Sequence, residues 1–134
     1  MERKNIDIGL LILRLTIGVL MLLHGVSKLI HGIGFIEGMF AEMGLPAFFA
    51  YGVLVGEIVA PALLIIGYRT RLAAIVFAFN MLVAVAMVHI NTLFTLSPQG
   101  GWAVELPAMF MLVAVVLIIT GGGKYAVSNK NRWD

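Results

Sequence analysis

Cysteine is absent from this sequence of 134 residues, and charged residues make up only 12% of it. Without cysteine the chain has no disulfide, no thiolate ligand for a metal ion and no paired thiols for redox chemistry. Any electron transfer by the protein would therefore need a bound cofactor, and we predict no metal site.

The scarcity of charge goes with an excess of apolar residues. Hydrophobic residues make up 61% of the chain and the mean hydropathy is +1.04, whereas soluble domains are about 45–50% apolar and about 25% charged. This composition excludes an ordinary soluble domain, and the length favours a single membrane domain over residues 1–134. The net charge of +2 is spread over short loops, so we expect membrane lipid rather than nucleic acid as a partner.

Four apolar stretches are long enough to cross a membrane as helices, which takes about 20 residues. They cover residues 8–30, 47–67, 71–93 and 102–121. The first is too long for a signal peptide and no A-x-A-like cleavage site follows it, so we expect it to be retained. The predicted fold is all-α: an integral membrane four-helix antiparallel bundle.

Lysine and arginine are missing from two of the loops, at residues 31–46 and 94–101. The remaining loop and the two chain ends carry basic residues, namely Arg3, Lys4, Arg69, Arg71, Lys124, Lys130 and Arg132. Because cytoplasmic loops carry an excess of Lys and Arg, both termini are predicted to be cytoplasmic. The predicted location is the inner (cytoplasmic) membrane, as a multi-pass protein.

The loop between the first two spans is itself amphipathic. Its apolar residues recur at helical spacing opposite two acidic residues, Glu37 and Glu42; they are Ile36, Met39, Phe40 and Met43. This pattern is typical of a helix that lies in the membrane interface. We predict a short interfacial helix between spans one and two.

Several ionisable or amide side chains interrupt the spans, and the helix rise of about 1.5 Å per residue gives their depth. A deep layer consists of Arg14, Glu57 and Asn80, and an outer layer of His24, Lys28, His89 and Glu105. A charge at the bilayer centre costs at least about 2.5–3.5 kcal/mol and is usually paired inside the bundle. We therefore predict that Arg14 pairs with Glu57, and that the outer layer lines a polar pocket.

The first span carries a stripe of residues that recur at intervals of four and three, namely Arg14, Gly18, Met21, Gly25 and Lys28. Such a rhythm places all of them on one face of a helix. The glycines on this face would let a neighbouring helix or a flat ligand approach closely. We expect the stripe to face the core.

The second span combines a proline with a ridge of small residues around Glu57. Pro61 lacks the N–H that would bond to the carbonyl of Glu57, so we expect a kink and a free acceptor there. Gly52, Gly56 and Ala60 form a small-xxx-small ridge that favours close helix association. One use of this ridge would be a homodimer through Gly52 and Gly56.

Most of these residues also have a purely structural interpretation. Arg14 and Lys28 resemble interface anchors, and Glu105 resembles a first-turn carboxylate. Asn80 would form an interhelical hydrogen bond. His24 and His89 would be core groups bonded to a carboxylate or to backbone. Glu57 fits a structural interpretation least well, because carboxylates at mid-membrane are usually functional.

The order and spacing of these residues resemble the DoxX family of small four-helix membrane proteins. The resemblance rests on "LRLTIGVLMLLHGVSKL" in span one, "GEIVAPALLIIGYRTRLAA" in span two, His89 late in span three and Glu105 early in span four. Span four departs from the family pattern, since Pro107 follows soon after Glu105. The resemblance implies a membrane component of a quinone-linked oxidoreductase system.

The first functional hypothesis is a redox subunit that binds a quinone within the bundle. Proton donors and acceptors would be Glu57, His24 and His89, and the binding residues would be Arg14, Lys28, Asn80 and Glu105. Because nothing in the chain carries electrons unaided, a redox or regulatory protein partner is expected.

Three alternatives come from other classes of protein. A membrane scaffold or assembly factor would use the same polar residues only to fix helix packing. A haem b protein would use His24 and His89 as axial ligands on different helices, although four spans leave little room for the macrocycle. A transporter is a further possibility, but one broken helix and the lack of a convincing internal repeat argue against it.

Overall fold

The computed structural model describes residues 2–88, 94–96 and 98–134. Within these ranges the regular elements are helices, and the extended backbone pairs only in one bridge between Leu96 and Trp102. The helices are α1 (Glu2–His31), α2 (Gly34–Glu42), α3 (Phe49–Leu54), η1 (Val55–Val59), α4 (Ala60–Ile66), α5 (Thr70–Val88) and α6 (Glu105–Thr120). The all-α prediction is confirmed. Because α3, η1 and α4 follow one another without a break, we call them together the rod.

The helices differ in length. In the described residues, α1 and the rod (Phe49–Ile66) are long and apolar enough to cross a membrane, whereas α5 and α6 are shorter apolar helices. At about 1.5 Å per residue, α1 is about 45 Å long and α6 about 24 Å. The predicted spans 8–30 and 47–67 therefore correspond to α1 and the rod. Residues 89–93 of the predicted third span lie outside the described residues.

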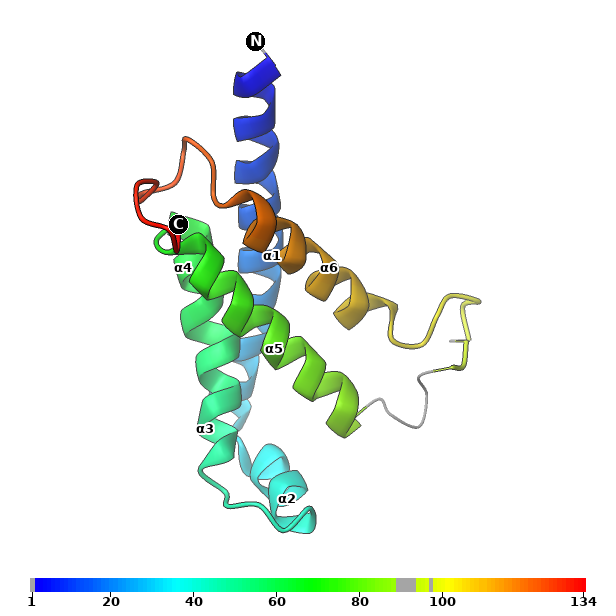
Figure 1. Cartoon of the computed structure of the whole chain (residues 1–134). Coiled ribbons are helices and arrows are strands. Elements are labelled where there is room, and N and C mark those ends of the chain that lie inside the picture. Colours follow the sequence, from blue (N-terminus) through cyan, green and yellow to red (C-terminus); the bar gives the residue numbers. More distant parts are fainter. Residues whose placement is uncertain (1, 89–93, 97) are drawn as a thin grey trace.

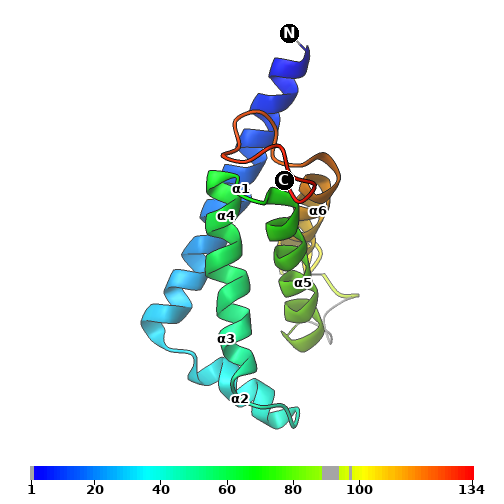
Figure 2. The same ribbon diagram turned by 60° about the vertical axis from the view of Figure 1, so that its left-hand side comes forward.

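Two antiparallel pairs of helices make up the molecule. The rod runs back along α1, and α6 runs back along α5 (Figure 1). The second pair crosses the first obliquely, and both chain ends lie at the same end of the molecule, opposite α2 (Figures 1 and 2). The pairs meet where α4 packs against α5 and where α1 packs against α6.

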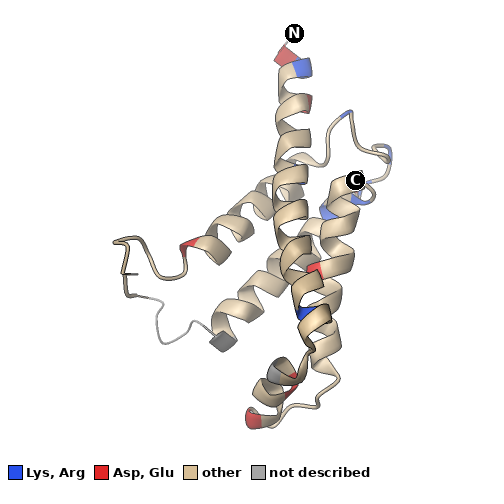
Figure 3. Cartoon of the chain, turned by 180° about the vertical axis from the view of Figure 1, so that it is seen from behind, with Lys and Arg blue, Asp and Glu red and all other residues tan. Residues whose placement is uncertain are grey.

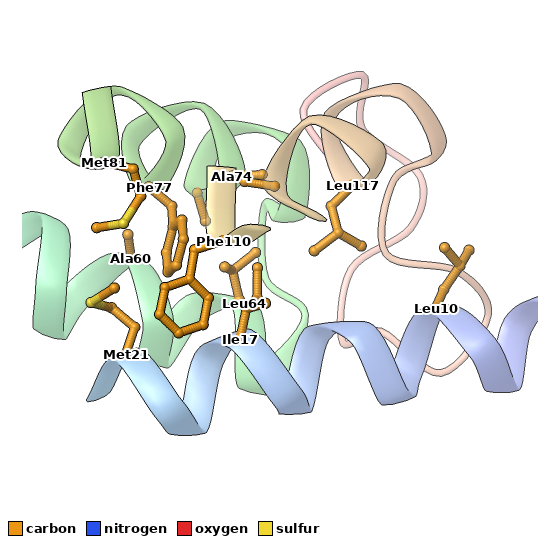
Figure 4. Packing of buried hydrophobic residues seen from close by; sticks show 12 residues of the cluster. Leu10, Ile17, Met21, Ala60, Leu64, Ala74, Phe77, Met81, Phe110 and Leu117 are labelled. Carbon is orange, nitrogen blue, oxygen red and sulfur yellow. The ribbon is translucent and has the colours of Figure 1, made fainter. Parts of the chain in front are cut away.

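The core lies between these two pairs (Figure 4). From α1 come Ile17 and Met21, from the rod Leu64, and from the second pair Phe77 and Phe110, all at most 5% exposed. The rings of Phe77 and Phe110 meet edge to face, with centroids 6.1 Å apart, which is a favoured aromatic geometry. The core therefore joins all four long helices.

The predicted stripe on α1 faces this core. Arg14, Gly18, Met21 and Gly25 are all buried. A Cβ atom on Gly18 would come within 2.6 Å of Ile65, and one on Gly25 would collide with the carbonyl oxygen of Glu57. The two glycines thus bring α1 into backbone contact with the rod. The prediction of a core-facing stripe is confirmed for these four residues, whereas Lys28 at its end is partly exposed.

A π-helical turn, η1, lies directly before Pro61. In it the N–H of Ala60 donates to the carbonyl of Val55, five residues back. Proline removes the donor that would close the next α-helical bond, and π-bulges often occur at functional sites. The structure therefore accommodates Pro61 with a widened turn that contains Glu57.

Helix α2 forms where the sequence predicts it. Ile36 and Phe40 are buried against Ala50 at the start of the rod, while Met43 is exposed. The helix thus closes the end of the molecule between α1 and the rod (Figure 2).

Large apolar side chains also cover the outside of the helices. Examples that are more than half exposed occur on α1, α5 and α6, namely Leu23, Ile30, Phe79, Leu112 and Ile119. Soluble monomers rarely expose contiguous apolar surface of this kind. Most of the lysine and arginine residues lie at the end of the molecule that holds both termini (Figure 3).

The C-terminal segment, residues 121–134, folds back over the turn between α4 and α5 (Figure 1). The carbonyl of Trp133 accepts the N–H groups of Arg71 and Leu72 at the start of α5, and Val127 donates to the carbonyl of Ile66 at the end of α4. These groups are the ones that helix ends leave unbonded. The segment therefore caps two helices at once, which the sequence did not predict.

Asp134 holds this segment together. Its Oδ1 accepts bonds from Arg69 (3.2 Å) and Ser128 (2.7 Å), and its Oδ2 accepts the backbone N–H groups of Lys130 and Asn131. Burial by itself would raise the pKa of Asp134, but these hydrogen bonds, with that from Ser128 foremost, hold it below its usual value. For Arg69, burial opposes the charge, but the interactions with Asp134 and Tyr68 together outweigh it and raise the pKa.

Candidate functional site

The side chains of Lys28 and Glu57 form an ion pair between α1 and the rod. The Nζ of Lys28 lies 2.5 Å from Oε1 of Glu57. The Glu57 side chain is 5% exposed and that of Lys28 is 38% exposed. The second carboxylate oxygen of Glu57, Oε2, is buried without a hydrogen-bond partner. Glu57 therefore keeps one free acceptor in the interior.

The predicted pairing of Arg14 with Glu57 is wrong. Arg14 is fully buried, and its Nη1 donates to the carbonyls of Leu64 (3.2 Å) and Ile65 (3.3 Å) at the end of α4. Gly25 is the residue of α1 that faces Glu57, which places Arg14 about 16 Å further along the helix by the rise per residue. Arg14 thus interacts with the negative end of α4, where a cation is favoured.

Asn80 of α5 faces the same region of the rod. It is buried, and its side chain lies so close to Gly56 that a Cβ atom there would come within 2.6 Å. Its Nδ2 has no hydrogen-bond partner, so the interhelical bond considered for it does not form through this nitrogen. Since buried polar groups nearly always find partners, the amide of Asn80 requires an explanation, as does Oε2 of Glu57.

A small cavity of about 50 Å³ lies between these groups. Its polar walls are Lys28, Glu57 and Asn80, and its apolar walls are Ile36, Met39, Val53, Val83 and Ala84. A volume of this size holds a water molecule or a single polar group of a ligand. The free acceptor of Glu57 and the free donor of Asn80 thus belong to residues that line one space, which we call the polar cavity.

A second cavity, of about 150 Å³, lies on the other side of Glu57. It is lined by His24, Glu57 and a set of mostly apolar residues, namely Met21, Met81, Ala84, Leu106, Pro107 and Phe110. The Nδ1 of His24 lies 3.0 Å from the carbonyl of Leu20. Because a carbonyl only accepts, this nitrogen carries the hydrogen, and the neutral ring keeps a lone pair on Nε2.

The predicted outer pocket is only partly present. His24 and Lys28 lie on either side of Glu57. Glu105, in contrast, is exposed at the start of α6 beside Gly101, and the neighbouring Leu106 and Pro107 line the cavity in its place. Its position agrees with the interpretation as a first-turn carboxylate. His89 lies outside the described residues.

An apolar groove of about 340 Å³ adjoins the polar cavity. It runs between the α2–α3 region and α5, and is lined by Phe40, Leu45, Phe49, Gly52, Val53, Gly56, Val76, Phe79, Asn80 and Val83. Val53, Asn80 and Val83 line both spaces. Of the two glycines considered for a homodimer, Gly56 is buried against Asn80, whereas Gly52 is exposed. The groove therefore leads from the molecular surface to the free amide.

The family model of DoxX matches residues 9–90. The chain belongs to the DoxX family. A protein of Bacillus subtilis (strain 168) named "Putative oxidoreductase CatD" is 30% identical over 118 residues, which cover 88% of this chain and 83% of that protein. No solved structure matches the chain.

The matched region of this DoxX protein includes His24, Lys28, Glu57 and Asn80. DoxX proteins are membrane proteins, so the apolar outer surface of the helices has a clear explanation. Glu105 and the C-terminal segment lie beyond the matched residues. The family match thus includes all the residues that line the polar cavity, whereas Leu106, Pro107 and Phe110 of the second cavity lie beyond it.

The chemistry available at this site is proton transfer and hydrogen bonding. Oε2 of Glu57 accepts a hydrogen bond or a proton, Nδ2 of Asn80 donates, and Lys28 stabilises negative charge on Glu57. His24 offers a second acceptor on the far side of Glu57. All four of these residues were expected from the sequence as site residues, but the Lys28–Glu57 pair and the groove were not.

Proposed function

We propose that this DoxX protein is an integral membrane subunit of a quinone-linked oxidoreductase system and that it binds a quinone inside its helix bundle. α1, the rod, α5 and α6 would be the four spans, with both termini cytoplasmic and α2 at the outer interface. The apolar outer surface, the clustering of basic residues at one end (Figure 3) and the family membership support this arrangement.

One observation carries the choice of ligand: an unpartnered acceptor and an unpartnered donor line a polar cavity that joins an apolar groove. A quinone has a flat ring with carbonyl oxygens and an apolar tail. Its carbonyl would accept from Nδ2 of Asn80, and the hydroxyl of the reduced form would donate to Oε2 of Glu57. The tail would lie in the groove between Phe49 and Phe79, which opens on the outer face of the helices.

Reduction of a quinone consumes two electrons and two protons. Glu57 is placed to pass a proton between the polar cavity and the side of the bundle on which His24 lies, since it lines both cavities. Lys28 would hold Oε1 of Glu57 in place through their hydrogen bond. The electrons would come from a partner protein, because the chain has no cysteine and no redox group of its own among its side chains.

Haem b is less well supported as a ligand. The cavity beside His24 has a volume of about 150 Å³, whereas cofactor pockets usually measure about 300–1,000 Å³. The cavity also contains the Glu57 carboxylate, a poor neighbour for a macrocycle. The groove, at about 340 Å³, lies within the usual range.

The test is mass spectrometry of the organic extract of protein purified in mild detergent. The wild type should contain quinone in near-stoichiometric amount, and Glu57→Gln should lose at least about tenfold, because a hydrogen bond to a charged group contributes about 1.5–3 kcal/mol. Glu42→Gln removes the same charge at the exposed end of α2 and should retain the quinone. Quinone at lipid-background level in the wild type would overturn the proposal and favour the scaffold hypothesis.

A further inference from the structure

A second and larger pocket lies at the end of the molecule that holds both termini. It measures about 770 Å³ and lies between the N-terminal turns of α1, the start of α5, the end of α6 and the C-terminal segment. Its charged walls are Arg3, Asp7, Arg71, Lys124, Lys130, Arg132 and Asp134. We call it the basic pocket. Neither Glu57 nor any other residue of the proposed quinone site lines it.

The two carboxylates in the basic pocket are already engaged by the protein. Asp7 accepts the backbone N–H of Lys124 (3.2 Å) and lies 3.8 Å from Arg3. All of the bonds of Asp134 described above go to groups of the loop and segment around it. Among the described residues, no ion pair joins Arg71, Lys124 or Lys130 to a carboxylate. The pocket therefore has uncompensated positive charge.

The walls of the pocket are held in place by the fold. Gly121 and Gly123 have positive φ angles of 77° and 83°, a backbone conformation that favours glycine. A Cβ atom on Gly121 would come within 2.9 Å of the Asp134 carbonyl and 3.2 Å of Nε of Arg71. This Nε is itself buried without an acceptor. The close packing of Gly121 on Arg71 thus fixes a guanidinium in the wall of the pocket.

Arg132 is positioned by a different contact. Its guanidinium lies over the ring of Trp133, 5.1 Å from the centroid, which is within cation–π range. The carbonyl of the same Trp133 caps α5. Cations thus reach the pocket from α1, α5 and the C-terminal segment. Three of them, Arg3, Arg71 and Arg132, are arginines, whose planar forks suit phosphate oxygens.

We infer that the basic pocket binds a phosphate group. Several cations around one space suit an anion with several oxygens and more than one charge. Two sources share this chemistry: the headgroup of an anionic phospholipid and a soluble phosphate compound. In the proposed topology the pocket lies at the cytoplasmic surface, where anionic headgroups attract basic residues. The inference does not depend on quinone binding.

The pocket offers two substitutions that leave its framework intact. Lys124 and Lys130 contribute backbone groups to the fold, namely N–H groups to Asp7 and Asp134. Within the described part of the chain, their side-chain nitrogens form no ion pair. Lys124→Gln/Lys130→Gln should therefore fold normally and bind phosphate weakly. Lys4→Gln is the matched control for each single change, because Lys4 is a basic residue at the same end that does not line the pocket.

The experiment is native mass spectrometry of the full chain in detergent, with added dioleoyl phosphatidylglycerol or phosphatidylcholine. A parallel arm measures thermal stability with inorganic pyrophosphate in the absence of lipid. The wild type and Lys4→Gln should retain the anionic lipid, or be stabilised by pyrophosphate, and the double variant should bind at least tenfold more weakly. Preference for the lipid or for pyrophosphate identifies the source.

Two results would overturn the inference. One is that the wild type retains phosphatidylglycerol no better than phosphatidylcholine and is not stabilised by pyrophosphate. The other is that Lys4→Gln loses as much binding as Lys124→Gln or Lys130→Gln, which would mean that only the overall charge of this end matters. Thermal melting of each variant without ligand separates a loss of binding from a loss of folding.

Discussion

Two carboxylates in this protein are almost equally buried but differ in what they bind. The Asp134 side chain is 3% exposed and that of Glu57 is 5% exposed. Both oxygens of Asp134 accept hydrogen bonds, whereas Glu57 uses one oxygen for Lys28 and leaves the other unpartnered. A buried carboxylate with all its acceptors filled is part of the framework, and one with an acceptor to spare is available to a ligand.

The largest effect is expected from removing the partner of Glu57. Lys28→Met leaves a buried carboxylate without its cation and should destabilise the protein by about 2–3 kcal/mol. The expected loss is smaller than the roughly 3–5 kcal/mol that removing one partner of a fully buried ion pair costs, because Lys28 is partly exposed. Denaturant unfolding in detergent measures the loss. Among the residues that the structure describes, Lys4 has no buried carboxylate partner, so Lys4→Met should change stability little. Equal losses of stability in Lys28→Met and Lys4→Met would contradict this account.

A smaller effect is expected from the glycine that lies against Glu57. Gly25→Ala places a Cβ atom against the Glu57 carbonyl, and overpacking of this kind costs about 1–3 kcal/mol. Gly9→Ala in the same helix meets nothing within 4 Å and should gain about 0.5–1 kcal/mol from helix propensity. The two alanine variants therefore shift the unfolding midpoint in opposite directions, and a shift in the same direction would refute the close contact.

Removing the free amide should change stability little. Asn80→Leu replaces a donor that has no partner with an apolar side chain of similar size, so the free energy of unfolding should stay the same or rise by up to about 1 kcal/mol. The amount of bound quinone should nevertheless fall. Denaturant unfolding measures the stability, and mass spectrometry of the organic extract of the same preparation measures the bound quinone. A large loss of stability would show that Asn80 is part of the framework, like Asp134.

The smallest effect concerns the framework carboxylate and pH. Because hydrogen bonding lowers the pKa of folded Asp134, its contribution to stability is present above the unfolded value of about 3.9 and is lost as the pH falls through the folded value. Protection of the Arg71 and Leu72 amides, which bond to Trp133, should therefore decrease on acidification below about pH 4. Hydrogen exchange measures it, and Asp134→Asn should remove this pH dependence.

Much of the helical layout followed from the sequence. Apolar runs located the long helices, and the spacing of Arg14, Gly18 and Gly25 identified the buried face of α1. The register between α1 and the rod did not follow, because the 31–46 loop fits more than one offset. The predicted partner of Glu57, Arg14, lies 14 residues along α1 from Lys28, the partner that the structure shows.

The C-terminal segment shows a second limit of sequence reasoning. Residues 121–134 lack helical or strand periodicity, and their contacts are mostly backbone bonds to α4 and α5. Such backbone bonds depend on how the folded chain brings residues 121–134 next to α4 and α5, so no pattern of side chains in the sequence predicts them. The hydrogen bond between Ser128 and Asp134 joins residues close in sequence, but an acidic and a hydroxyl residue at this spacing do not by themselves predict the segment's fold. Unpartnered buried groups such as Nδ2 of Asn80 likewise become visible only when every neighbour is known.

The π-helical turn has a consequence for the angular phase of the rod. Each residue of an α-helix advances by about 100° around the axis, and η1 fits one residue more than an α-helix would into the same bond pattern. On a helical wheel drawn for one uninterrupted α-helix, the residues of α3 are therefore out of phase with those of α4. A chain one residue shorter within Val55–Val59 would close this turn as ordinary α-helix and leave Phe49 and Val53 facing α5. The same deletion elsewhere in the rod would rotate α3 by about 100° relative to α4.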